Sequence, residues 1–231
     1  MLELSPTEWT AIELSLRVAT VATLVGTPLG IAVAWLLARR EFWGKALVDA
    51  LVHLPLVLPP VVTGYLLLLT FGRRGLVGAW LADHLGIVFA FRWTGAALAC
   101  GIMAFPLLVR PIRLSIEAVD QRLEQAAATL GAAPWRVFAT VTLPLALPGV
   151  LAGMVLGFAK AIGEFGATIT FVSNIPGETQ TISSAIYSLI QTPDGDAAAM
   201  RLVVVSIIIA MAALVASEWF ARRALQRLHG N

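Results

Sequence analysis

Two charged side chains, Lys160 and Glu164, lie inside a long apolar stretch and are the first candidates for a chemical role. They are four residues apart, so a helix would place them on one face. A lysine here could attract an anion, although conduction requires weak binding and a strong permanent site would trap the anion. Charges in membrane helices usually face the bundle interior or a wet cavity. The pair therefore borders a path for a polar solute, fixes helix packing as an ion pair, or lies near the outer interface.

Other candidates for such a path lie beside this pair and in an earlier apolar stretch. Glycines on both sides of Glu164-Phe165 permit close approach of helices, and Phe165 is either a gate side chain or ordinary packing. A Pro-Pro pair in the earlier stretch predicts a kink, because proline lacks the N–H that a helix interior needs. The pore and gate candidates are Pro59, Pro60, Thr63, Gly64, Lys160, Glu164, Phe165 and Gly166.

The sequence contains no set of residues that indicates catalysis. A Gly-rich phosphate-binding loop with Lys-Ser/Thr is absent, so we expect this chain not to hydrolyse ATP. The three histidines and the single cysteine lack metal-site spacing, and Cys100 is expected to be a small buried hydrophobe. An enzyme or assembly factor would need a polar cluster within the apolar segments, where only Lys160 and Glu164 qualify. We therefore expect no catalytic residue, no metal and no cofactor in this chain.

Residues 121–142, which we call the elbow, form the one long polar-to-amphipathic interruption of the apolar sequence. The elbow begins with charged residues and an alanine run suited to helix. Gly131 is typical of a helix C-cap, and Pro134 suits the first turn of a second helix, where N–H groups are unpaired. The pattern predicts two short helices, the first from about Arg122 to Leu130. The elbow is either an ordinary loop or a docking site for a partner protein.

The elements that must position these residues are membrane-spanning helices. Of 231 residues, 58% are hydrophobic and 13% are charged, and the mean hydropathy is +0.85, whereas soluble domains carry about 25% charged residues. The net charge of +2 does not suggest a nucleic-acid partner. We expect one all-α domain over residues 1–231, with further short helices at 1–13, 76–85 and 182–190. The predicted spans, each long enough for a ~30 Å hydrocarbon core, are about 14–38, 51–71, 93–109, 145–171 and 202–220.

Basic residues in the connections predict the orientation, because cytoplasmic loops carry an excess of lysine and arginine. Ten of them fall on one side of a five-span chain: Arg39, Arg40, Lys45, Arg110, Arg113, Arg122, Arg136, Arg222, Arg223 and Arg227. Five fall on the other side: Arg17, Arg73, Arg74, Arg92 and Arg201. The N-terminus is therefore expected outside (periplasmic), and the elbow and the C-terminus in the cytoplasm.

The elbow resembles the EAA signature of ABC importer permeases. Gln125-Ala-Ala, Gly131 and Leu143-Pro144 fall at the family's spacing over twenty residues. Two positions depart from the pattern, because Gln125 replaces the glutamate, with Glu124 one place earlier, and Val141 replaces an isoleucine. The resemblance implies a coupling helix that docks in a groove of the ATP-binding subunit. The coupling residues that it implies are Glu124, Gln125, Ala126, Ala127, Gly131, Arg136, Leu143 and Pro144.

Two further stretches, His53–Tyr65 and Gly163–Ile182, look like the molybdate permease family, and the resemblance covers essentially the whole chain. Sulfate permeases share the Glu-Phe-Gly core at 164–166 and are the alternative, a sulfate/thiosulfate importer. The runs Gly72–Gly75 and Asn174–Thr179 are closer to molybdate. The resemblance implies import of molybdate, and of tungstate with it, across a bacterial inner membrane.

The same resemblance implies the fold and the partners. The fold is a polytopic type I importer core with five spans, and two copies form the pore as a homodimer within membrane lipid. Two ATP-binding subunits use ATP and Mg²⁺ at the cytoplasmic face, and a periplasmic molybdate-binding protein supplies specificity. The candidates for contact with that protein are Arg73, Arg74, Asn174 and Glu178. A secondary transporter is the competing class, but the sequence has no convincing inverted repeat.

Overall fold

The computed structural model describes residues 4–228, with side chains described as far as residue 216. Regular structure in this part of the chain is helical throughout, as the sequence predicted. One π-helical turn, η1 (Phe138–Thr142), stands among the α-helices. The α-helices are α1 (Pro6–Arg39), α2 (Lys45–Val57), α3 (Pro60–Phe71), α4 (Leu76–Leu85), α5 (Trp93–Glu117), α6 (Gln121–Thr129), α7 (Pro134–Val137), α8 (Leu143–Ile162), α9 (Gly166–Val172), α10 (Ile182–Leu189) and α11 (Asp196–Leu228).

Helix α1 begins earlier than the predicted span at 14–38, so the separate interfacial helix expected within 1–13 was wrong. Ser5 and Glu8 form a capping box, in which each side chain bonds to the backbone N–H of the other residue. This box satisfies two N–H groups that a helix start leaves unpaired. Pro28 lies inside α1 without ending it. The result is one helix of 34 residues.

The second predicted span, 51–71, is divided into α2 and α3, which are bent by 115° relative to each other. Leu58 between them is extended (φ −71°, ψ 142°), because a residue before proline is disfavoured in the helical region. Pro60 then opens α3 at a position where no N–H is needed. The predicted kink is therefore a sharp corner at Leu58-Pro59.

The third and fourth predicted spans also have different limits in the structure. Helix α5 continues to Glu117 rather than ending near residue 109, because Pro106 and Pro111 are accommodated within it. The fourth, 145–171, ends at Ile162, and α9 follows after the short break at 163–165. By length and composition, four helices within the described part of the chain are able to cross a membrane, or five if the bent α2–α3 pair is one span.

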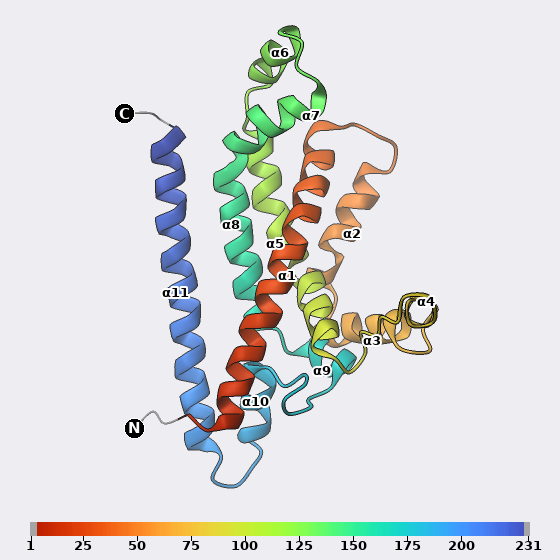
Figure 1. Ribbon diagram of the computed structural model, residues 1–231, viewed down its shortest axis with the longest axis vertical. Coiled ribbons are helices and arrows are strands. Elements are labelled where there is room, and N and C mark those ends of the chain that lie inside the picture. Colours follow the sequence, from red (N-terminus) through yellow and green to blue (C-terminus); the bar gives the residue numbers. More distant parts are fainter. Residues whose placement is uncertain (1–3, 229–231) are drawn as a thin grey trace.

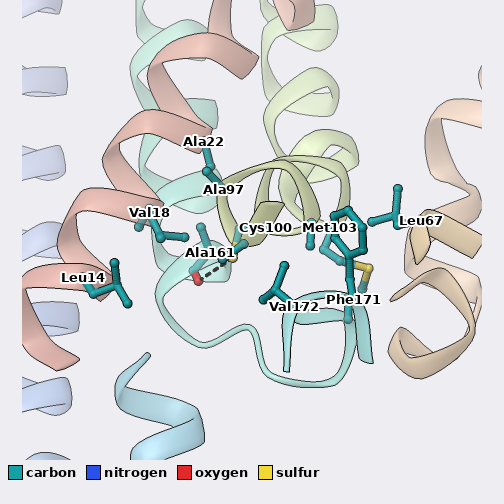
Figure 2. Close-up of a cluster of buried hydrophobic side chains, with 14 of the residues drawn as sticks. Leu14, Val18, Ala22, Leu67, Ala97, Cys100, Met103, Ala161, Phe171 and Val172 are labelled. Atoms are coloured by element: carbon teal, nitrogen blue, oxygen red, sulfur yellow. Dashed lines mark hydrogen bonds between the residues drawn. The ribbon is translucent and has the colours of Figure 1, made fainter. Parts of the chain in front are cut away.

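The centre of the molecule is the packing of α1, α5 and α8, which run side by side in Figure 1. Glycines let α5 and α8 approach closely: a Cβ at Gly153 would stand 2.6 Å from the Leu108 carbonyl oxygen. Figure 2 shows part of the core, with Leu14 and Val18 of α1, Cys100 of α5 and Phe171 of α9. Cys100 is fully buried, which confirms the sequence prediction, and its thiol donates to the Ala161 carbonyl at 3.5 Å.

The predicted basic connections lie at one end of the molecule (Figure 1). This end, which we call the inner end, holds the elbow, the α1–α2 connection and the C-terminal end of α11. The opposite, outer end holds the start of α1 and α10. The side chains of Arg222, Arg223 and Arg227 lie outside the described ones. The periplasmic N-terminus and cytoplasmic elbow stay predictions from the charge distribution.

Candidate functional site

The elbow at the inner end is built by strong local signals. Asp120 caps α6 by accepting a hydrogen bond from the Arg122 N–H at 2.9 Å. Helix α6 ends at Thr129, and Gly131 follows with φ +86°, a left-handed conformation that glycine adopts without strain. Pro134 starts α7. The structure therefore has a helix–turn–helix elbow, with α6 within one residue of the predicted limits.

A π-helical turn joins α7 to α8. Pro144, the second residue of α8, has no N–H to continue the hydrogen-bond ladder. The π-helical turn η1 comes immediately before α8, and the Leu143 N–H bonds to the Phe138 carbonyl. Such turns add a residue relative to an α-helical ladder and often mark functional positions. Thr142, at the end of η1, is buried.

Glu124 is turned toward the bundle rather than toward solvent. Its Oε1 atom accepts hydrogen bonds from Arg39 Nε at 3.2 Å and Nη2 at 3.0 Å, and from Thr142 Oγ1 at 2.6 Å. Arg39 Nη2 also donates to the Val119 carbonyl at 3.1 Å. We call Arg39, Glu124 and Thr142 the clasp. The sequence prediction named Glu124 as a coupling residue but missed Arg39 and Thr142 as its partners, since no local pattern links them.

Large apolar side chains are exposed on the elbow among polar ones. Leu130 is 89% exposed, and Leu123 and Trp135 are also exposed. Among the predicted coupling residues, Gln125, Ala126, Gly131 and Arg136 are exposed, while Ala127, Leu143 and Pro144 are half-buried. The Arg136 guanidinium lies 5.7 Å from the Trp135 ring centroid. Sequence reasoning missed Leu123, Leu130 and Trp135, although apolar residues beside a polar turn were a usable signal.

A cavity of about 590 Å³ separates the elbow from the inner end of α1. The side chains that line it include Trp35, Arg40, Gln121 and Gln125, together with the three residues of the clasp. Helix α6 has no buried residue. Helix α6 is therefore loosely packed on the bundle and is tied to α1 by the clasp, whereas Phe138 of η1 packs edge-on against Trp35 of α1 with ring centroids 6.1 Å apart.

The predicted pore candidates come together where α3 meets α9. A Cβ at Gly64 would stand 2.4 Å from the Ala167 carbonyl oxygen, and one at Gly166 would stand 2.7 Å from Pro60 Cβ. Glycine therefore permits contact of the two helix backbones here. Thr63 is buried beside this contact, and its hydroxyl has no hydrogen-bond partner among the described residues. Pro59, by contrast, is exposed at the corner between α2 and α3.

Lys160 and Glu164 form an ion pair of 2.6 Å across the end of α8. The Glu164 side chain is 1% exposed, whereas Lys160 is partly exposed. The second Glu164 oxygen accepts the Ala167 N–H at 3.0 Å, so the carboxylate also fixes the start of α9. Of the interpretations left open by the sequence, the geometry supports the ion pair that fixes helix packing. Phe165 packs against Tyr187 of α10 with ring centroids 4.9 Å apart.

At the outer end, the predicted contact residues divide into two kinds. Asn174 is turned inward, and its Nδ2 donates to Ser188 Oγ at 2.6 Å, so it fixes the loop against α10. Glu178, Arg73 and Arg74 are exposed. Neither arginine belongs to an ion pair within the described side chains. Only these three are therefore placed to meet a partner directly.

Comparison with known proteins gives a consistent result. Residues 26–228 match the family model described as binding-protein-dependent transport system inner membrane component. The chain is 61% identical to the molybdenum transport system permease protein ModB of Escherichia coli (strain K12), over 97% of this chain and 98% of that one. It is 58% identical to ModB of Haemophilus influenzae, with the same coverage. The sulfate transport system permease protein CysT of E. coli is 36% identical over 89% of this chain and 73% of its own.

Solved structures of transporters have the same fold. A bacterial ABC transporter involved in import of the acidic polysaccharide alginate matches with a TM-score of 0.74 at 20% identity, over 95% of this chain and 80% of that chain. An inward-facing methionine ABC transporter matches with a TM-score of 0.67 at 14% identity, over 94% of both chains. These likenesses show the fold alone.

Proposed function

This chain belongs to the family of binding-protein-dependent transport system inner membrane components, and we propose that it is the permease subunit of an ABC importer that carries molybdate across the bacterial inner membrane. The assignment of molybdate as the substrate rests on the sequence identity of 61% to a molybdenum permease along nearly the whole of both chains. The chain is a multi-pass inner membrane protein with several apolar helices. A sulfate importer is the alternative, supported by the more distant CysT.

The elbow is the proposed docking site for a separate ATP-binding subunit that hydrolyses ATP with Mg²⁺. It projects from the inner end of the bundle and presents Leu123, Leu130 and Trp135 to solvent. Burial of such side chains on association is worth roughly 1.5–3 kcal/mol each. The exposed Gln125 and Arg136 supply polar contacts around them.

A second copy of the chain completes the proposed pore, and each copy binds one ATP-binding subunit. Helix α3 supports this assembly, because it carries exposed apolar side chains along most of its length, among them Val61, Tyr65 and Leu69. Its opposite face packs on α9 at the pore candidates Gly64 and Gly166. In a dimer about this surface, the α3–α9 pairs of the two copies would border a shared path.

A periplasmic binding protein delivers the substrate in this proposal. One of the related solved structures is in complex with a substrate-bound periplasmic protein. The exposed Arg73, Arg74 and Glu178 are the proposed contacts at the outer end. Molybdate and tungstate are tetrahedral dianions of nearly equal size, so the permease path is expected to accept both.

The test is ATP-driven uptake by the reconstituted complex. The permease, its ATP-binding subunit and its binding protein are placed in liposomes with radiolabelled molybdate. We expect uptake that requires ATP and the binding protein, and that excess tungstate suppresses more strongly than excess sulfate does. Uptake of labelled sulfate without uptake of molybdate would favour the sulfate alternative, and uptake without ATP would exclude the ABC mechanism.

A further inference from the structure

We propose that the clasp of Arg39, Glu124 and Thr142 makes α1 follow the elbow, so that Glu124 is a positioning residue for energy coupling and not a contact to the ATP-binding subunit. The inference rests on the proposed function, because it concerns how movement of the docked elbow reaches the bundle. It assigns a role to a carboxylate that stands one position away from the family signature.

The clasp joins three separate segments at a single carboxylate oxygen. Glu124 comes from α6, Arg39 from the last turn of α1, and Thr142 from the end of η1, immediately before α8. The Arg39 and Glu124 side chains are 9% and 19% exposed, so the pair is largely shielded from water although it borders the cavity. Hydrogen bonds to charged groups are stronger than neutral ones, and solvent screening weakens a sheltered pair little.

Helix α6 has little else to hold it against α1, although Phe138 at the other end of the elbow packs on Trp35 of α1. Helix α6 has no buried residue, and the cavity of about 590 Å³ lies between it and the inner end of α1. Little apolar packing therefore links α6 directly to α1. The clasp crosses this gap, and the Arg39 bond to the Val119 carbonyl extends it to the end of α5.

Helix α1 is suited to carry the movement to the outer end. With 34 residues, it is about 51 Å long at 1.5 Å per residue. Near its outer end, Glu8 pairs with Arg201 of α11 at 2.9 Å, and Ser15 Oγ accepts the Ile182 N–H of α10 at 2.7 Å. A displacement of Arg39 would therefore reach α10 and α11 through direct hydrogen bonds from α1.

The experiment uses the complete complex of permease, ATP-binding subunit and binding protein in liposomes. Glu124→Gln removes the charge of the clasp, and Thr142→Val removes its hydroxyl while retaining side-chain shape. Thr142→Ser keeps the hydroxyl, and Glu41→Gln removes an exposed carboxylate that pairs with Lys45 in the neighbouring connection. Three quantities are measured for each: recovery of the ATP-binding subunit, ATP hydrolysis, and molybdate imported per ATP hydrolysed.

We expect Glu124→Gln and Thr142→Val to retain the ATP-binding subunit and to import about tenfold less molybdate per ATP, since a charge-assisted hydrogen bond is worth roughly that factor in an equilibrium. Thr142→Ser and Glu41→Gln should match the wild type. Unchanged import per ATP in the first two variants would overturn the proposal. Loss of the ATP-binding subunit from the Glu124→Gln complex would also overturn it, because Glu124 would then be a docking contact. A wild-type complex that fails to import molybdate would instead refute the proposed function.

Discussion

Replacement of Gly64 by alanine should force α3 and α9 apart. The new Cβ would stand 2.4 Å from the Ala167 carbonyl oxygen and 2.9 Å from both Ala167 Cα and Thr170 Cβ. Real Cβ atoms essentially never come closer than 3.0 Å, so the helices must separate by about 0.6 Å. A rotamer change cannot provide this space, because two of the three atoms belong to the α9 backbone.

Overpacking of this kind costs typically about 1–3 kcal/mol. For a chain of this length, about 2 kcal/mol corresponds to a fall in melting temperature of roughly 4–8 °C. The measurement is thermal unfolding of the purified protein in detergent, followed by molybdate uptake in liposomes. Uptake should fall as well, because the displaced α3–α9 pair carries the pore candidates.

Gly101→Ala on α5 is the matched control. Its Cβ would meet only ordinary contacts, with Ala22 atoms at 3.8–3.9 Å. We expect a change within roughly 0.5 kcal/mol, as for substitutions that disturb no packing. If Gly64→Ala melted like the wild type and Gly101→Ala, the close α3–α9 contact would be refuted.

Three further substitutions test other parts of the structure. Lys160→Met should destabilise the protein by about 3 kcal/mol and lower its melting temperature, because it leaves Glu164 buried without its cation. Adding Glu164→Gln should restore most of the melting temperature, and additive losses would contradict the ion pair. Ser15→Ala should cost about 1–3 kcal/mol and speed hydrogen exchange of the Ile182 amide, which donates to the Ser15 hydroxyl; unchanged exchange would argue against this bond. Leu130→Asp should weaken recovery of the ATP-binding subunit by about tenfold or more. Leu76→Asp is the control, because it changes a similarly exposed leucine on α4 and should leave recovery unchanged. Equal recovery with both variants would contradict docking at the elbow.

The elbow illustrates what the sequence reveals and what it cannot. The limits of α6 follow from local signals, the cap at Asp120 and the left-handed Gly131, so prediction came within one residue. The direction of Glu124 depends on Arg39, which lies 85 positions away in the chain. No local pattern encodes that pairing, and the neighbouring position in the family signature suggested an outward role. Tertiary contacts alone turn Glu124 inward.

The division of the fourth predicted span has a similar origin. Residues 145–171 are apolar on both sides of the break, so composition gives one continuous helix. The structure instead ends α8 at Ile162, and Glu164 accepts the N–H of Ala167 to start α9. The lysine–glutamate pair was correctly placed on one face, because four-residue spacing is a local property. The break between α8 and α9 depends also on a tertiary contact, because Pro60 of the neighbouring α3 lies against Gly166 at the start of α9.

The distribution of polar ties and glycine contacts indicates which parts move together. Lipid is as apolar as leucine, so burial of apolar surface does little to fix one membrane helix on another. Close backbone contact does so for α5 with α8, through Gly149 and Gly153, and for α3 with α9, through Gly64. These pairs are therefore rigid units. Helix α1 also packs closely on α5, with Gly30 against Leu108, and it has an ion pair near each end, Arg39–Glu124 and Glu8–Arg201. The two ion pairs connect α1 to the elbow at one end and to α11 at the other, so we expect movement of the elbow to carry α1 and the helices packed on it.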